Sequence, residues 1–158
     1  MTDAVEHAPA NEERLRAAIG PRADYYLRKW REMDAKGKAY DWNWAACFLN
    51  VFWFAYRKMW GPMVAMGLLY VVTSPILDPT HKTLLKIVLV VLVGASFVTG
   101  SLGNRLYRAR VMRILAETGG ADPAKRGGVS LGAALAALVV VAVLSAVAGM
   151  IPAMMGRG

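Results

Sequence analysis

Few side chains in this chain of 158 residues are suited to catalysis. A metal or haem site needs clustered His or Cys ligands, whereas His7 and His81 lie far apart and Cys47 is the single cysteine. Asp41 is the only carboxylate beside an apolar segment, and one isolated acid more often caps a helix or pairs with a cation such as Arg57 than acts as a general base. HExxH and phosphate-binding glycine motifs are absent from the sequence. The sequence therefore predicts no enzyme, no catalytic residue, no metal and no cofactor.

The sequence contains more residues suited to binding than to catalysis, because several cations lie beside aromatic residues. The adjacent cations Arg57 and Lys58 lie in a segment, residues 42–60, that holds four of the five tryptophans. Indole and phenol rings favour the membrane interface, and Lys and Arg attract anionic lipid head groups. Candidate interface or lipid-contact residues are therefore Trp44, Phe48, Phe52, Trp53, Tyr56, Arg57, Lys58, Trp60, Arg105 and Arg108. Two uses remain open for them, an aromatic belt that anchors the chain and a dedicated pocket for a lipid or a partner.

Long uncharged runs indicate what positions these residues. Runs of nineteen, eighteen and thirty uncharged residues follow Lys58, Lys86 and Arg126. A helix of eighteen or more apolar residues crosses a hydrocarbon core of ~30 Å. Three such helices in so short a chain would leave nothing to wrap them in a water-soluble fold. The sequence predicts an all-α integral membrane protein with three transmembrane helices, at about residues 60–76, 84–102 and 129–150.

The cations are concentrated in two parts of the chain. Ten of the nineteen Lys and Arg residues lie in residues 1–60, and six lie in residues 105–126. The positive-inside rule places both parts in the cytoplasm, which also explains the basic charge without nucleic acid. The first forty residues contain no apolar region that would serve a cleavable signal. We expect a multi-pass protein of the bacterial inner membrane, with a cytoplasmic N-terminus and a periplasmic C-terminus.

Both basic parts of the chain remain in the cytoplasm only if the aromatic segment, residues 42–60, does not cross the membrane. Residues 44–56 would form ~20 Å of helix, too short to span. We therefore expect an interfacial or re-entrant helix over residues 42–58. That helix is apolar nearly all round and needs cover on two sides. A helix starting near Pro21 is the candidate roof, with one face formed by Tyr26, Trp30 and Met33.

Further patterns concern packing and domain organisation. Small residues at a spacing of four predict close approach of helices, either within the chain or in a homo-oligomer, at Ser96, Gly100, Gly103 and Gly132. Between the second and third spans, a basic amphipathic helix has one apolar face, made by Tyr107, Val111, Ile114 and Leu115. That face should contact the membrane or the aromatic helix. We expect a cytoplasmic segment over residues 1–41, disordered over 1–12, and a membrane domain over residues 42–158.

Several motifs together resemble a known family. They are WAACF (44–48), FW (52–53), YRKMW (56–60) and, after the spans begin, GNxxY with Gly103, Asn104 and Tyr107. They resemble a bacterial family of small inner-membrane proteins catalogued as a domain of unknown function, over about residues 42–113. The resemblance implies a membrane location and adds no activity that could be carried over.

Taken together, these features favour a non-catalytic accessory or scaffold subunit that packs against a larger membrane complex or organises lipid. The alternative is a small channel or transporter subunit that is active as an oligomer. Expected partners are anionic membrane lipids and a membrane protein whose identity the sequence does not give. A homo-oligomer remains open, and nucleic acid is not expected.

Overall fold

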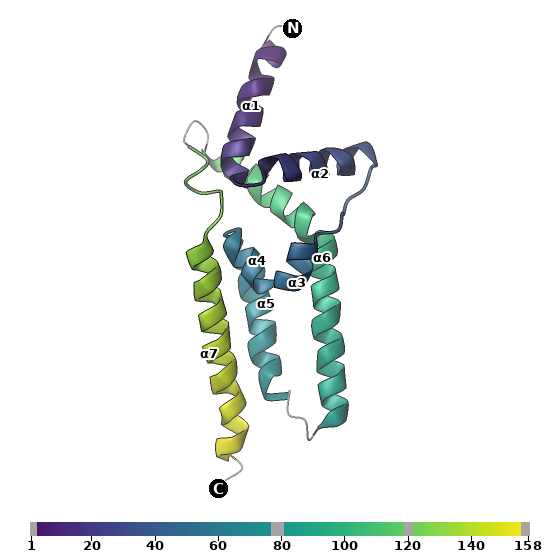
Figure 1. The fold of residues 1–158 in the computed structure, drawn as a ribbon, viewed down its shortest axis with the longest axis vertical. Helices are drawn as coiled ribbons and strands as arrows, with labels where there is room; N and C mark the ends of the chain where they lie inside the picture. Colours follow the sequence, from purple (N-terminus) through teal and green to yellow (C-terminus); the bar gives the residue numbers. More distant parts are fainter. Residues whose placement is uncertain (1–2, 77–80, 119–121, 156–158) are drawn as a thin grey trace.

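The computed structural model of the chain describes residues 3–76, 81–118 and 122–155, and the regular elements in these ranges are all helices. This confirms the predicted all-α class. In chain order they are α1 (Asp3–Ile19), α2 (Ala23–Ala35), α3 (Trp44–Leu49), α4 (Val51–Tyr56), α5 (Trp60–Thr73), the 3₁₀ turn η1 (Ser74–Ile76), α6 (Lys82–Thr118) and α7 (Leu131–Met155). Figure 1 shows α1 and α2 above, α5, α7 and the first half of α6 below, and the short α3 and α4 between them.

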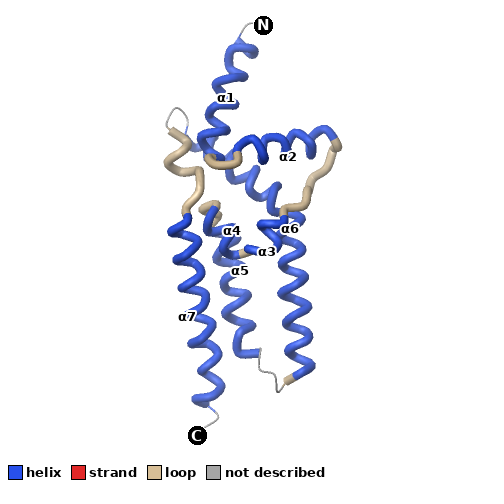
Figure 2. Tube along the Cα trace, viewed as in Figure 1, coloured by secondary structure: helices blue, strands red, loops and turns tan. Residues whose placement is uncertain are grey.

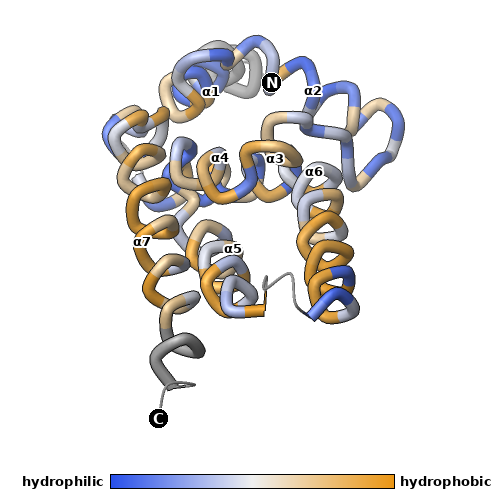
Figure 3. Tube along the Cα trace, turned by 60° about the horizontal axis from the view of Figure 1, so that its bottom comes forward, coloured by the Kyte–Doolittle hydropathy of each residue, from blue (hydrophilic) through white to orange (hydrophobic). Residues whose placement is uncertain are grey.

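The lower helices consist mainly of apolar residues, orange in Figure 3, and many of their side chains are exposed. Val72 of α5 is 68% exposed, Val90 of α6 is 72% exposed and Leu131 of α7 is 66% exposed. By length and composition, α6 and α7 are long enough to cross a membrane, whereas α5 is a shorter apolar helix. The sequence-based span at residues 60–76 thus coincides with α5 and η1, which alone do not establish a third crossing.

Helix α6 differs from the sequence-based expectation of a span over residues 84–102 followed by a separate basic helix. It is one helix from Lys82 to Thr118. No proline interrupts this stretch. Gly103 lies inside the helix where a side chain would collide with Ala46 of α3. The predicted apolar face is confirmed, since Tyr107, Val111 and Ile114 are buried. It is buried beneath α1 and α2, and Tyr107 also contacts Trp53 of the aromatic segment, which is one of the two expected contacts.

The aromatic segment is not one helix over residues 42–58 but two short helices, α3 and α4. They are separated by Asn50, whose φ of 42° and ψ of −110° interrupt the helical path. Asparagine tolerates positive φ better than most residues. Its side chain also donates hydrogen bonds to Ser96 and Thr99 of α6, which hold the break in place. Helix α3 packs on α6, while α4 packs on α5 and α7.

Helix α2 is the predicted roof. Tyr26, Trp30 and Met33 are 3–5% exposed and belong to the principal core, together with Trp53 and residues of α1 and α6. At the N-terminus the structure differs from the disorder expected over residues 1–12, because α1 begins at Asp3. Helix-forming Ala, Glu and Arg residues dominate this segment. Figure 2 shows that the loops leading from α2 to α3 and from α6 to α7 both lie in the upper half of the molecule.

Candidate functional site

Arg57 lies where four helices meet and is only 3% exposed. It is the residue directly after α4. Its Nη1 donates hydrogen bonds to the Ile19 carbonyl at 3.3 Å and to Tyr107 Oη at 3.1 Å. Tyr107 Oη in turn donates to the same Ile19 carbonyl at 3.2 Å. Ile19 is the last residue of α1, so this carbonyl lies at the negative end of a helix dipole, which stabilises a cation.

Three aromatic rings surround the same guanidinium. The Arg57 Cζ atom lies 4.6 Å from the ring centroid of Tyr26, 4.8 Å from that of Tyr107 and 5.5 Å from that of Tyr56. Arginine over an aromatic face is attracted by the ring quadrupole, more strongly when water is excluded. We call Arg57, these three tyrosines and the Ile19 carbonyl the Arg57 cage.

The cage holds a cation without a matching anion. The ion pairs found among the described residues do not include Arg57. Its Nε atom is buried and has no hydrogen-bond partner. An unpaired buried charge is strongly unfavourable, because the lost hydration must be replaced. One carbonyl, one hydroxyl and three rings replace only part of that hydration.

Tyr107 is held in its protonated form by the cage. Burial raises the pKa of Tyr107 to about 12, although the nearby positive charge of Arg57 acts in the opposite direction. The proton is needed, because the hydroxyl accepts one hydrogen bond from Arg57 and must donate its own proton to the Ile19 carbonyl. The residue therefore links α1, α4 and α6 through one oxygen atom.

The loop that precedes α7 closes over the cage. Lys58, at φ 54°, donates from Nζ to the Gly127 carbonyl at 2.8 Å. The Gly128 amide donates to the Ala18 carbonyl and the Ser130 amide to the Tyr56 carbonyl, each at 2.8 Å. Gly127 must be glycine here, since a Cβ atom would overlap the Ala18 carbonyl. These bonds tie the start of α7 to the ends of α1 and α4.

A second polar cluster joins α3 to α6. Asn43 Nδ2 donates to Asn104 Oδ1 at 2.8 Å, and the Asn43 amide donates to the Gly100 carbonyl at 2.8 Å. Asn50 Nδ2 lies 3.3 Å from Ser96 Oγ and from Thr99 Oγ1, whereas Asn50 Oδ1 is buried without a hydrogen-bond partner. This cluster fixes the broken aromatic segment against α6.

The structure separates the predicted contact residues into three groups. Exposed residues that remain open to lipid or a partner are Trp44, Phe48, Trp60 and Arg105. Half-buried ones are Phe52, Tyr56, Lys58 and Arg108. Trp53 and Arg57 are buried, each 3% exposed, Trp53 in the principal core and Arg57 in the cage.

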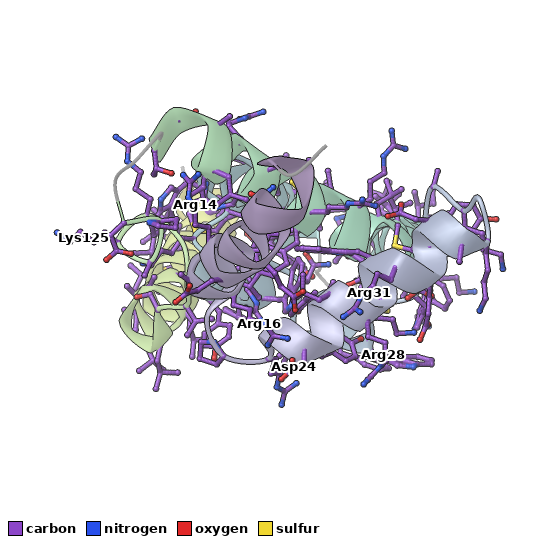
Figure 4. All side chains as sticks on the ribbon, turned by 90° about the horizontal axis from the view of Figure 1, so that it is seen from above. Arg14, Arg16, Asp24, Arg28, Arg31 and Lys125 are labelled. Carbon is purple, nitrogen blue, oxygen red and sulfur yellow. The ribbon has the colours of Figure 1, made fainter. Side chains whose placement is uncertain are left out.

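Arg108 is engaged within the protein. Its Nη1 and Nη2 donate to the two carboxylate oxygens of Asp34 at 2.6 and 2.8 Å, a bidentate pair that joins α6 to α2. The guanidinium lowers the pKa of Asp34 below its usual range. Figure 4 shows other charged side chains of the upper layer from above, with Arg16 beside Asp24 and with Arg28 and Arg31 along α2.

The small residues also differ in their surroundings. A Cβ atom on Gly100 would lie 2.8 Å from Cys47 Cβ, and one on Gly103 would lie 2.7 Å from Ala46 Cβ. Ser96 receives the hydrogen bond from Asn50. These three residues therefore lie against the aromatic segment, whereas a Cβ atom on Gly132 would meet nothing within 4 Å.

Sequence reasoning missed most of the cage. Tyr26 and Tyr107 were expected only as members of apolar helix faces, and a backbone carbonyl such as that of Ile19 carries no sequence signal. Asn104 and Tyr107 do stand in the GNxxY motif, which was the available indication that this turn of α6 has a particular role. In the sequence, Asn50 is the one strongly polar residue between Trp44 and Tyr56.

No curated protein and no solved structure matches the chain. A family model described as "Protein of unknown function (DUF2628)" matches residues 10–113. The match runs from within α1 to within the second half of α6, so it includes each residue of the Arg57 cage and both sides of the cluster around Asn50 and Asn104. It ends before the loop that closes the cage and before α7. The chain belongs to this DUF2628 family, whose function is unknown.

Proposed function

We propose that the protein spans the membrane three times, through α5 with η1, the first half of α6, and α7, and that the upper layer faces the cytoplasm. Support comes from the length and hydropathy of α6 and α7 and from the cations of α1, α2 and the second half of α6. Helix α5 alone is about 21 Å long, so local thinning of the bilayer would have to accompany its crossing.

Within the membrane, we propose that the protein is a non-catalytic accessory or scaffold subunit. The observation that carries this proposal is the first half of α6. It stands apart from α5 and α7 in Figures 1 and 3 and packs on the rest of the lower layer mainly near η1. Val93 and Phe97 on it are 56% and 57% exposed. The second half of the same helix is firmly built into the upper layer, so α6 presents a fixed, uncovered apolar surface.

Site-specific photocrosslinking tests this proposal. A photoreactive residue is introduced at Phe97 in the full chain and irradiated in native membranes. We expect a discrete protein adduct, because a partner helix should cover this surface. The matched control is Val143 of α7, which is 55% exposed and should give lipid adducts alone. If Phe97 also yields only lipid adducts, the scaffold proposal fails for this surface.

The broken aromatic segment favours a second candidate, a channel or transporter subunit that is active as an oligomer. Asn50 lies at a cavity of ≈ 360 Å³ whose lining also includes Tyr70, Ser74 and Ser145. Broken helices with unsatisfied polar groups at membrane depth line aqueous or substrate paths in transporters. Reconstitution into dye-loaded liposomes tests this. Ion flux that exceeds protein-free liposomes and falls in Asn50→Ala would support it, and flux equal to the protein-free control would exclude it.

A further inference from the structure

A cavity of ≈ 350 Å³ lies beside the Arg57 cage, between α2, α4 and the first turn of α7. Its lining has two chemical parts. Arg22, Tyr26, Tyr56 and Arg57 supply charge and aromatic rings, whereas Leu49, Leu131 and Ala134 supply aliphatic surface. Such a lining suits a ligand with an anionic group at one end and a hydrocarbon chain at the other.

The charged side chains of the lining are all positive. Among the described residues, the lining contains two arginines and no acidic residue. Arg57 is 3% exposed and retains an Nε atom without a partner, so a buried positive charge borders the cavity. Arg22 precedes α2, and the nearby carboxylate of Asp24 is engaged at 2.6 Å by Arg16 (Figure 4). The described protein groups therefore leave the charge at this cavity uncompensated.

The position of the cavity matches the boundary between the two layers. Arg22 belongs to the cationic upper layer, while Leu131 begins the apolar helix α7 and is 66% exposed. If the lower helices span the membrane as proposed, this boundary lies at the level of the lipid phosphates. A free inorganic anion would use only the arginines and would leave Leu131 and Ala134 uncovered. A phospholipid fills both parts of the lining.

We propose that this cavity binds one anionic phospholipid, with its phosphate against Arg22 and Arg57 and an acyl chain along Leu131 and Ala134. Guanidinium groups bind phosphate oxygens through paired, charge-assisted hydrogen bonds. The bound phosphate supplies the counter-charge that the cage lacks. This inference rests on the proposed membrane insertion and adds to it a specific lipid site.

Native mass spectrometry of the full-length protein, released from detergent in the presence of phosphatidylglycerol or phosphatidylcholine, tests the site. We expect one phosphatidylglycerol to be retained in preference to phosphatidylcholine. Arg22→Gln should lower the retained phosphatidylglycerol about five-fold, the effect of one cation near an anionic head group. Arg28→Gln removes an exposed charge from the same helix outside the cavity and is the matched control, expected to bind as wild type. Equal loss in both variants would overturn the site.

Two further measurements separate this site from simpler explanations. Ala134→Trp should fill the apolar part of the cavity and reduce retention although every cation is kept. Inorganic phosphate added at millimolar concentration should not displace the lipid, and full displacement would identify a soluble-anion site instead. If labelling shows an inserted chain that retains both lipids equally, the lipid site is refuted while the membrane proposal stands. A chain that is not inserted refutes both.

Discussion

Arg57 shows how a cation can be buried without a carboxylate. The α1 terminus contributes a carbonyl and its dipole, Tyr107 contributes a hydroxyl, and three rings contribute their faces. Each of these groups is neutral, so removing one leaves the charge less well solvated. The cage also joins α1, α2, α4 and α6, and a change at one residue should therefore be felt by the whole upper layer.

The hydroxyl of Tyr107 is the most direct test of the cage. Tyr107→Phe keeps the ring but leaves Arg57 Nη1 and the Ile19 carbonyl each short of one hydrogen bond. We expect a loss of about 1–3 kcal/mol in the free energy of unfolding, the usual cost of leaving buried polar groups unsatisfied. Thermal unfolding in detergent, followed by tryptophan fluorescence, measures it. Tyr40→Phe removes a hydroxyl from a side chain that is 60% exposed and should unfold as wild type. Equal stability of all three proteins would contradict the role of the hydroxyl.

Alkaline pH should weaken the same cage. The pKa of Tyr107 is about 12 in the folded protein and near 10 in an unfolded chain. A raised folded pKa gives stability that is complete below pH 10 and is lost as the pH rises toward 12, on the order of 2–3 kcal/mol. Unfolding free energies of wild type and Tyr107→Phe, compared from pH 8 to pH 12, measure this. The difference between the two proteins should shrink above pH 10, and a constant difference would contradict the assignment.

At the scale of elements, sequence patterns identified helix faces but not helix ends. The spacing of Tyr26, Trp30 and Met33 along the chain places them on one helix face, so their burial could be predicted from the sequence. The break at Asn50 depends on Ser96 and Thr99, which lie 46 and 49 residues away, so no local pattern could show it. For the same reason the cage escaped prediction, since Ile19, Arg57 and Tyr107 meet only after the chain has folded. The motif GNxxY supported only the family resemblance and predicted no role or partner for Asn104 or Tyr107.

Glycine substitutions test how closely α3 approaches α6. Gly100→Ala and Gly103→Ala would place a methyl group 2.8 Å from Cys47 Cβ and 2.7 Å from Ala46 Cβ. The helices must then shift, and we expect a loss of about 1–3 kcal/mol in the free energy of unfolding. Gly132→Ala is the matched control, because its methyl group meets nothing within 4 Å and alanine favours a helix. Thermal unfolding in detergent compares the three variants. Destabilisation by Gly132→Ala as well would indicate instead that Gly132 packs in a homo-oligomer.

The whole molecule combines a polar layer that is tied together by specific bonds with an apolar layer that is loosely covered. Arg108 with Asp34, Arg57 with Ile19, and Lys58 with Gly127 join elements of the upper layer. In the lower layer α5 packs on α7, whereas the first half of α6 packs mainly on α3 and near η1 and leaves side chains such as Val93 and Phe97 exposed. A membrane would supply the missing cover, and the cations of the upper layer would then fix which side of it faces the cytoplasm.

Cysteine labelling and a C-terminal reporter together test this orientation and the number of crossings. After Cys47→Ala, single cysteines are placed at exposed positions by Lys38→Cys, Arg113→Cys and His81→Cys. On intact cells a membrane-impermeant maleimide should label only His81→Cys, because the proposed topology places His81, at the start of α6, outside. Lys38→Cys and Arg113→Cys should react only after the cells are opened. Labelling of either one from outside would reverse the orientation, and protection of His81→Cys would mean that the hairpin does not cross. Whether α7 also crosses needs the reporter, because none of the three cysteines lies beyond α7. With three spans, a C-terminal alkaline phosphatase is exported and active, whereas two spans would return it to the cytoplasm, where it is inactive.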